Sequence, residues 1–485
     1  MCSKNSIRIL VALLLVPLAA LHAAAAPGKR PNILWLLAED MSPHLGCYGD
    51  NTIQTPNIDR LAARGVLFER AFVTAPICSP SRSALITGMY QTTIGAQNHR
   101  SGRGKEKILL PAGVVPVPQL FREAGYYTCN SGYYPSRDKG KPDYNFEVDP
   151  RIYDGVDWSG RKPGQPFFAQ IQLLGGKTRD LPDELVKARQ QLGGSTPTNS
   201  FSLPPYYPPT PAMLEDWAGT LDAVRMTDRQ VGEIVDRLRA EGLLDQTIVF
   251  FISDHGVSHV RGKQFLYDEG IHIPFVVSGL GLAPGRRQDL IEHIDMVAMS
   301  LGLAGIPIPA WMQGRNVLAS DYKARGAVFA ARDRADETVD RIRSVRTSRW
   351  KYIRNFMPRR PYLQPNAYKD HKPCLIALRA AETAGPLDAA QTLILAPIRP
   401  PEELYDLQAD PWEIRNLAAD PLHAATLKEY RDRLDFWVER TGDQGGTPES
   451  KSRYASEMAA YLGPKGDVEI EKNIRLMKQW AGEWK

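Results

Sequence analysis

This chain of 485 residues contains two short pairs of polar residues that could bind a metal ion or take part in catalysis. One pair is Glu39 and Asp40, the other is Asp254 and His255, and each directly follows an apolar run of strand length. Because ligands of open α/β sheets bind beyond the carboxyl ends of strands, we expect the two pairs to meet at one edge. Three carboxylates without thiolates favour a hard cation, Ca²⁺ or Mg²⁺, over zinc, although imidazole suits such a cation poorly. The alternative for any one pair is a solvated turn or a helix cap.

One cysteine, Cys78, lies in the stretch APICSPSR at residues 75–82. The residues at 81–88 predict the start of a helix, and a helix N-terminus favours negative charge beside it. An isolated cysteine is otherwise more often a buried, inert side chain. The four cysteines beyond the first 26 residues show no CxxC spacing, so they predict neither a zinc site nor a disulfide scaffold.

Strand and helix patterns alternate around these residues. Four continuous apolar runs of strand length lie at 33–37, 167–171, 247–253 and 273–277. Strands that are buried on both faces have this pattern, and they occur in parallel or mixed sheets. An amphipathic helical pattern occupies residues 220–244, with its apolar side chains on one face. The alternation predicts an α/β domain, a sheet sandwiched by helices, over roughly residues 30 to 340.

Beyond this domain the pattern changes, and we expect a smaller C-terminal α+β subdomain. Residues 343–354 predict a paired, partly exposed strand segment, and residues 421–485 predict charged helix. Between residues 179 and 216 the chain is rich in Pro, Ser and Thr, which predicts a long irregular connection of the kind that covers a site. The predicted division of the chain is a signal peptide at 1–26, a catalytic domain at 27–342 and the C-terminal subdomain at 343–485.

The first 26 residues combine a short basic region, an apolar stretch and an alanine-rich end, as a secretory signal peptide does. The alternative is an uncleaved membrane anchor, but Pro17 and the small residues before the predicted cleavage site favour removal. No other apolar run is long enough to span a bilayer, so we expect a periplasmic or secreted protein without a membrane span. The formal net charge of +5 falls to about +3 without Lys4 and Arg8, which is too little to indicate nucleic-acid binding.

The sequence CSPSRSALITG at residues 78–88 resembles the first signature of the type I sulfatases. In that family Cys-x-Pro-x-Arg marks a cysteine that a formylglycine-generating enzyme oxidises to formylglycine, also called 3-oxoalanine. Both polar pairs, RGKQ at 261–264 and ELYDL at 403–407 are similar to the family too, so the resemblance covers nearly the whole chain after the signal. It is strongest with a carbohydrate sulfatase subgroup that contains SDHG and RGKQFLY. The resemblance implies the alkaline-phosphatase-like α/β fold.

This resemblance also implies roles for individual residues. It implies a Ca²⁺ site, with Ca²⁺ preferred to Mg²⁺, made by Glu39, Asp40, Asp254, His255 and the modified Cys78. Arg82 would support the formylglycine, and Lys263 would hold the sulfate group. Positive charges are expected around the site because the transferred group is anionic and preorganised charges stabilise it.

Three departures from the family pattern bear on the site. Glu39 stands where the family usually has Asp, which lengthens one ligand arm. After the stretch similar to the second signature, residues 125–132, Tyr133 takes the place of an active-site lysine. Lys141 is the predicted replacement, with Lys139 as the second candidate. The histidine expected after the apolar run that begins at residue 167 is absent, and Gly-Gly-Lys177 stands there instead. The residue that protonates the leaving group is therefore open.

His259 is our prediction for that acid, with Lys177 as its rival. His259 lies shortly beyond the second polar pair and close in sequence to Lys263, and a histidine suits proton donation near neutral pH. The alternative is a surface or structural histidine. Lys177, His99 and Arg100 are candidates for binding sulfate or sugar, and a surface loop is the alternative for the last two.

These features together predict an exported, Ca²⁺-dependent formylglycine sulfatase that hydrolyses sulfate esters, or N-sulfate, of a sulfated carbohydrate. Its partners would be that carbohydrate and the formylglycine-generating enzyme. One alternative is a phosphodiesterase or phosphonate hydrolase of the same superfamily. The other is a non-catalytic protein that binds sulfated glycans and whose Cys78 is never modified.

Overall fold

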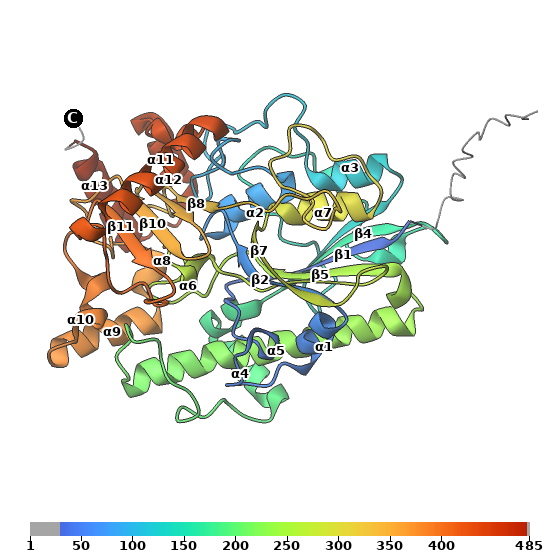
Figure 1. Ribbon diagram of the computed structural model, residues 1–485, viewed down its shortest axis with the longest axis horizontal. Coiled ribbons are helices and arrows are strands. Elements are labelled where there is room, and N and C mark those ends of the chain that lie inside the picture. Colours follow the sequence, from blue (N-terminus) through green and yellow to red (C-terminus); the bar gives the residue numbers. More distant parts are fainter. Residues whose placement is uncertain (1–29, 483–485) are drawn as a thin grey trace, which may run out of the picture. The chain divides into compact units, whose positions relative to one another are not determined.

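A seven-stranded mixed sheet lies at the centre of the computed structural model, which describes residues 30–482 (Figure 1). The predicted signal peptide, residues 1–26, lies outside the described residues. The strands are β1 (Asn32–Ala38), β2 (Gly65–Phe72), β3 (Tyr127–Tyr133), β4 (Phe167–Leu173), β5 (Thr247–Ser253), β6 (Phe275–Ser278) and β7 (Gly285–Glu292). Their order across the sheet is β3-β4-β1-β5-β6-β2-β7.

The middle of this sheet confirms the predicted strands. β1 pairs in parallel with β4 on one side and β5 on the other, and β6 runs antiparallel to both of its neighbours. Every residue of β1, β4 and β5 is buried, as their continuous apolar sequences predict. Ala38 is in register with Leu173 and Ser253, so the residues after these three strands leave the sheet at the same edge.

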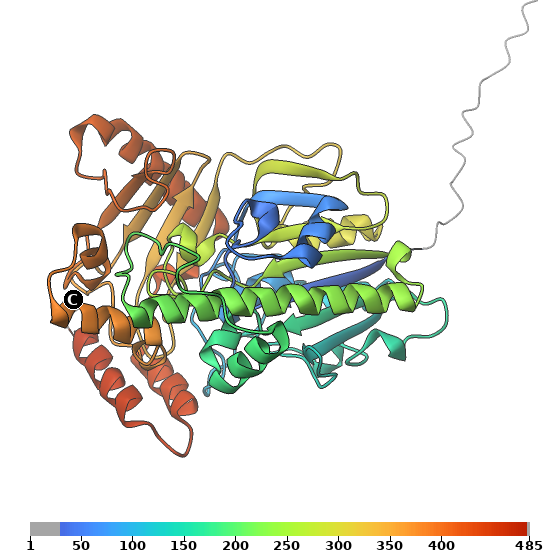
Figure 2. The ribbon, with the colours of Figure 1, turned by 90° about the horizontal axis from the view of Figure 1, so that it is seen from below.

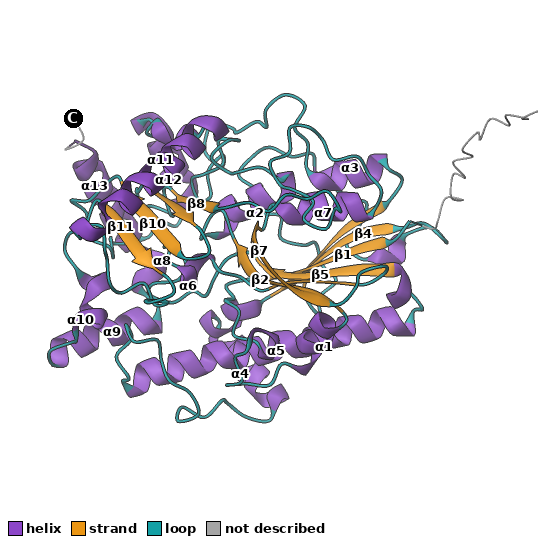
Figure 3. Cartoon of the chain, in the orientation of Figure 1, coloured by secondary structure: helices purple, strands orange, loops and turns teal. Residues whose placement is uncertain are grey.

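Helices cover both faces of the sheet, so the predicted sandwich is confirmed (Figure 3). On one face lie α1 (Pro56–Ala63), α4 (Pro182–Leu192) and α5 (Pro211–Ala240), and α5 lies in front of the strands in the view from below (Figure 2). On the other face lie α2 (Cys78–Thr87), α3 (Val117–Glu123) and α7 (Asp295–Leu303). Trp35 of β1 packs edge-on against Phe168 of β4 in the core between them.

The predicted irregular connection at 179–216 is only partly correct. α4 occupies residues 182–192, and α5 begins at Pro211, before the predicted start at residue 220. Both helices begin with a proline, which a helix accepts in its first turn because the missing N–H has no partner there. The prolines of this segment therefore start helices as well as prevent them.

A second, four-stranded antiparallel sheet follows. Its strands are β8 (Val328–Arg332), β9 (Ile342–Arg346), β10 (Trp350–Asn355) and β11 (Glu402–Asp406), in the order β11-β10-β9-β8. This sheet includes β8, which lies before residue 343, where the sequence predicts the C-terminal subdomain to begin. Residues 31–482 form one compact unit, and the division at 342/343 stays a prediction.

The remaining helices lie around the second sheet and between the two sheets. They are α6 (Asp268–Ile271), α8 (Ala367–Asp370), α9 (Pro373–Ala384), α10 (Ala389–Thr392), α11 (Ala424–Thr441), α12 (Lys451–Leu462) and α13 (Val468–Gly482). The last three confirm the predicted helical tail. Within residues 30–482 no helix is both long and apolar enough to cross a membrane.

Candidate active site

Cys78 is the first residue of α2, which starts beside the edge of the sheet where β1 and β5 end. All ten residues of α2 are buried, which its small Ser, Thr and Ala side chains allow. Ser81 anchors the first turn, because its Oγ donates to the carbonyl oxygen of Asp254 at 2.5 Å and lies 3.1 Å from His293 Nε2. The cysteine is thereby held against the loop that follows β5.

The two polar pairs meet at this edge, as predicted. The backbone N–H of Asp40 donates to Asp254 Oδ1 at 3.2 Å, and Asp40 has a φ of 56°, an uncommon left-handed conformation that Asp tolerates better than most residues. Gly175 and Gly176 pack against this turn so closely that a Cβ on either would lie 2.2 Å and 2.0 Å from the carbonyl oxygens of Glu39 and Asp40. The glycines found in place of the expected histidine thus have a packing reason.

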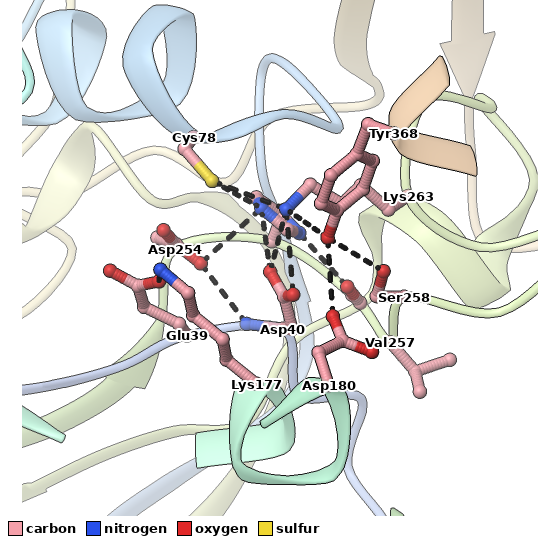
Figure 4. A network of polar contacts seen from close by, with 12 residues as sticks. Glu39, Asp40, Cys78, Lys177, Asp180, Asp254, Val257, Ser258, Lys263 and Tyr368 are labelled. Carbon is pink, nitrogen blue, oxygen red and sulfur yellow. Dashed lines mark hydrogen bonds and ion pairs between the residues drawn. The ribbon is translucent and has the colours of Figure 1, made fainter. Parts of the chain in front are cut away.

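Positive groups surround the thiol of Cys78, which is 6% exposed (Figure 4). Its Sγ lies 3.3 Å from His255 Nε2 and 3.3 Å from Lys263 Nζ. Burial alone would raise the pKa of the thiol, but the charges of Lys263, Lys141 and His255 hold that pKa well below its usual value. His255 Nε2 and Lys263 Nζ also each lie 3.1 Å from Asp40 Oδ1. The site therefore favours an anionic group at position 78.

Arg82 joins the two carboxylates on the far side of Cys78. Its Nη2 donates to Glu39 Oε1 at 3.0 Å and its Nε to Asp254 Oδ2 at 3.1 Å. Burial would raise the pKa of Glu39, but Arg82 and Lys141 lower it to about 2. Glu39 is therefore ionised at neutral pH and keeps its longer arm in the site.

Lys141 and Lys177 both reach the same carboxylate, so the structure brings these two predicted residues into the site. Lys141 Nζ lies 2.8 Å from Glu39 Oε1, and Lys177 Nζ lies 3.1 Å from Glu39 Oε2. Tyr133, which replaces the expected lysine, donates its hydroxyl to Glu39 Oε1 at 2.6 Å. Tyr133 thus still gives Glu39 a hydrogen bond from the place of the expected lysine, while Lys141 supplies the positive charge.

His99 and Arg100 lie on another side of the thiol. A ring nitrogen of His99, the Sγ of Cys78 and a carboxylate oxygen of Asp143 all lie within 4.8 Å of one another. The guanidinium of Arg100 lies 3.7 Å from Asp336, and its side chain is 41% exposed. His99 therefore belongs to the interior of the site, and Arg100 lies where a larger ligand could reach it.

His259 does not join this group. It is fully buried beside α5, where its Nε2 lies 3.0 Å from Thr220 Oγ1 and 3.5 Å from Asp216 Oδ2, and its ring packs against Trp217. Burial, together with the nearby Arg179, lowers the pKa of His259 well below its usual value. The loop after β5 turns toward α5 at this residue, so closeness in sequence to Lys263 does not place His259 at the thiol. The prediction that it protonates the leaving group has no geometric support.

Several residues of the site have no sequence motif. Tyr368 of α8 places its hydroxyl 3.3 Å from Lys263 Nζ, and Asp336, which follows β8, lies 2.9 Å from a nitrogen of His99. Gln172 of β4 accepts a hydrogen bond from Arg82 at 2.7 Å. Gln172 could have been found from the sequence, because it is a polar residue near the end of an apolar strand. Tyr368 and Asp336 reach the site only through tertiary packing.

The carboxylates of the site are suitable ligands for a hard divalent cation. Asp40 and His255 converge with Cys78, and so do Glu39 and Asp254, with the candidate ligand atoms of each group within 4.8 Å of one another. Glu39 Oε2 accepts no hydrogen bond among the described residues although it is buried, and its ion pair with a lysine leaves lone pairs free. The three carboxylates of these two groups offer the oxygen ligands that Ca²⁺ prefers. The residues present therefore fit the predicted metal.

Comparison with known proteins agrees with this geometry. Residues 31–306 match the family model described as Sulfatase, and residues 255–363 match the model described as N-sulphoglucosamine sulphohydrolase, C-terminal. The chain is 32% identical over 467 residues to an ulvan-active sulfatase of Formosa agariphila, covering 87% of this chain and 77% of that protein. It is 28% identical to the human N-sulphoglucosamine sulphohydrolase, covering 85% of this chain and 91% of the relative.

The fold is also similar to that of solved structures. A putative sulfatase from Bacteroides thetaiotaomicron superposes with a TM-score of 0.62 and 20% identity, over 88% of this chain and 96% of the other. This likeness confirms the predicted alkaline-phosphatase-like α/β fold. The family model covers more than half of the chain and includes Cys78 and both polar pairs. The chain therefore belongs to the sulfatase family and is a sulfuric ester hydrolase.

Proposed function

We propose that the protein is an exported formylglycine sulfatase that uses Ca²⁺ to remove sulfate from a sulfated polysaccharide or from its saccharide fragments. The observation that carries this proposal is the setting of Cys78. It lies at the start of a buried helix in the sequence CSPSR, among positive groups and opposite three carboxylates. The amino-terminal sequence supports export.

The comparisons support the class of substrate. One relative is described as active on ulvan and another as acting on N-sulphoglucosamine, and both cover most of this chain. A sulfated saccharide is therefore the substrate class that we propose, as an O-sulfate or an N-sulfate.

The chain's own residues have defined tasks in this proposal. Formylglycine at position 78 would supply the hydroxyl nucleophile, and Ca²⁺ held by Glu39, Asp40, Asp254 and His255 would supply positive charge. Lys263 and Lys141 stabilise the charge of a bound sulfate group, because both ammonium groups are fixed by carboxylates before substrate arrives. Arg82 holds two of the carboxylates in place.

Burial also bears on how Cys78 is modified. With only 6% of the residue exposed, the thiol is covered by folded chain on most sides. A formylglycine-generating enzyme would therefore need to act before the site closes around α2. The free thiol that the structure contains is the precursor state in this proposal.

The deciding experiment compares protein made with and without a formylglycine-generating enzyme. We expect mass analysis of the peptide that contains residue 78 to show formylglycine only in the first sample, and only that sample to release sulfate from sulfated oligosaccharides. Cys78→Ala should be inactive in both, while Cys129→Ala, which removes a buried thiol of β3, should stay active. Sulfate release by Cys78→Ala at the wild-type rate would contradict the proposal, and hydrolysis of aryl phosphodiesters alone would favour the phosphodiesterase alternative.

A further inference from the structure

His99 carries a ring nitrogen that no described residue uses. The residue is 3% exposed, and its Nδ1 lies 2.9 Å from Asp336 Oδ1, whereas its Nε2 has no hydrogen-bond partner among residues 30–482. An unpaired buried polar atom destabilises a folded protein, so such atoms usually have a ligand or a function. A ring nitrogen of His99 lies within 4.8 Å of the Sγ of Cys78. The ring of His99 thus lies beside the place where the sulfate ester would react.

The backbone around His99 is held from two directions. The backbone N–H of His99 donates to the carbonyl oxygen of Arg334 at 2.8 Å, and Arg334 Nη1 donates back to the carbonyl oxygen of His99 at 3.1 Å. The next residue along, Arg100, donates its backbone N–H to Ser79 Oγ in the first turn of α2 at 2.8 Å. These contacts fix the ring relative both to Cys78 and to the loop that contains Asp336.

Asp336 sets the chemical form of the ring. Its buried carboxylate accepts from Nδ1–H, which leaves Nε2 as the nitrogen that can carry and give a second proton. Burial would raise the pKa of Asp336, but His99 and Arg100 lower it to about 2, so the carboxylate is charged at neutral pH. The fixed negative charge beside Nδ1 orients the ring, as carboxylate partners of histidine do in other sites.

Other cationic groups near Cys78 already have partners. Lys141 and Lys177 are ion-paired with Glu39, and Lys263 is ion-paired with Asp40. Each of these ammonium groups is thereby held as a charge that binds the sulfate group. His99 differs because its second nitrogen is uncommitted.

We propose that His99 is the acid that protonates the leaving oxygen of the substrate and that Asp336 positions its ring. As the hydroxyl nucleophile at position 78 bonds to sulfur, it gives its own proton to solvent. The bond from sulfur to the bridging oxygen breaks, and its electron pair stays on that oxygen. The bridging oxygen takes the proton from His99 Nε2 and leaves as an alcohol, or as an amine in the case of an N-sulfate. The ring then regains a proton from solvent. This inference rests on the proposed sulfatase function and adds the residue that its leaving group needs.

The test uses two substrates that differ in their leaving group. A sugar alkoxide is a poor leaving group and needs the proton, whereas an activated aryl sulfate needs it little. For formylglycine-containing His99→Gln we expect kcat/KM on a sulfated oligosaccharide to fall by about 10² to 10⁴, while kcat/KM on 4-nitrophenyl sulfate falls by less than about 10-fold. Asp336→Asn should lower kcat on the oligosaccharide at least about 10-fold, with KM and the aryl rate little changed.

Matched variants give the outcomes that would overturn the proposal. His259→Gln should leave the ratio of the two rates at the wild-type value, because that residue lies beside α5. Equal loss on both substrates by a folded, fully modified His99→Gln would mean that His99 binds sulfate, and selective loss only in Lys177→Ala would make Lys177 the acid. If the modified wild type releases sulfate from neither substrate, the sulfatase function itself fails. If the modified wild type hydrolyses both substrates and His99→Gln lowers both rates equally, the sulfatase function stands and only the role of His99 as the acid is refuted.

Discussion

His293 should make the folded protein sensitive to acid. The residue lies between β7 and α7 with its side chain fully buried. Its Nδ1 accepts from the backbone N–H of Thr74 at 3.3 Å, and its Nε2–H donates to the carbonyl oxygen of Ser81 at 3.0 Å. If the ring were protonated, its Nδ1–H would point at the backbone N–H of Thr74, so two donors would face each other. Burial accordingly lowers the pKa of His293 to about 4, and the neutral ring supports the turn of α2 that carries Cys78.

The sign and size of the effect follow from this shift. Above the ordinary histidine value of 6.5 the ring is neutral in the folded and the unfolded chain, so pH has no effect through this group. Below pH 6.5 this histidine binds a proton in the unfolded chain, whereas in the folded chain it stays neutral until the pH falls to about 4. The free energy of unfolding therefore falls by about 1.4 kcal/mol per pH unit, or about 3.4 kcal/mol in total, of which about 2.5 kcal/mol is lost by about pH 4.5.

Urea unfolding followed by tryptophan fluorescence measures this loss. Wild type and His293→Gln are compared from about pH 7.5 to about pH 4.5, where the linear extrapolation gives each free energy of unfolding. The variant should be less stable at neutral pH but should lose about 2.5 kcal/mol less over this range. His371→Gln, which changes an exposed histidine, should keep the wild-type dependence. A His293→Gln curve parallel to that of the wild type would refute the reasoning.

Two further predictions concern buried charge. Arg343→Met should lower the free energy of unfolding by about 3–5 kcal/mol in urea, because the guanidinium lies fully buried between Asp333 and Asp443 and its loss leaves both carboxylates unpaired; an unchanged midpoint would show that the pairing is not needed. Ca²⁺ at about 100-fold its Kd should stabilise the wild type by about 2.7 kcal/mol in thermal unfolding, chelator should reverse this, and Asp254→Asn should remove it. A full Ca²⁺ response in that variant would contradict the metal site.

The main sheet was predictable from local pattern. Strands that are covered by helices on both faces have continuous apolar sequences, so β1, β4 and β5 were visible along the chain. The parallel pairing of β1 with β5 brings their ends to one edge, which is why the two polar pairs meet as predicted. The irregular connection at 179–216 was predicted less well, because a proline pattern does not distinguish a loop from a helix start.

The predicted proton donor shows what position along the chain leaves undecided. His259 was favoured for its place after the second polar pair, but the loop turns it into the core beside α5. Lys141, chosen as a replacement for a missing lysine, does reach Glu39, because the chain after β3 returns to the sheet edge. His259 and Lys141 both lie at plausible positions in the sequence. Only the paths of their loops decide that Lys141 reaches Glu39 and that His259 does not reach the thiol.

By itself the sequence determined the sulfatase signature at Cys78, the carboxylates at the strand ends and the α/β architecture, because each depends on neighbours along the chain. The tertiary structure alone decided which distant side chains join that signature. His99 and Asp336 are 237 positions apart, and no local pattern links them. Their contact exists because the loop after β8 packs against the loop after α2, and such packing depends on the shape and burial of the whole core.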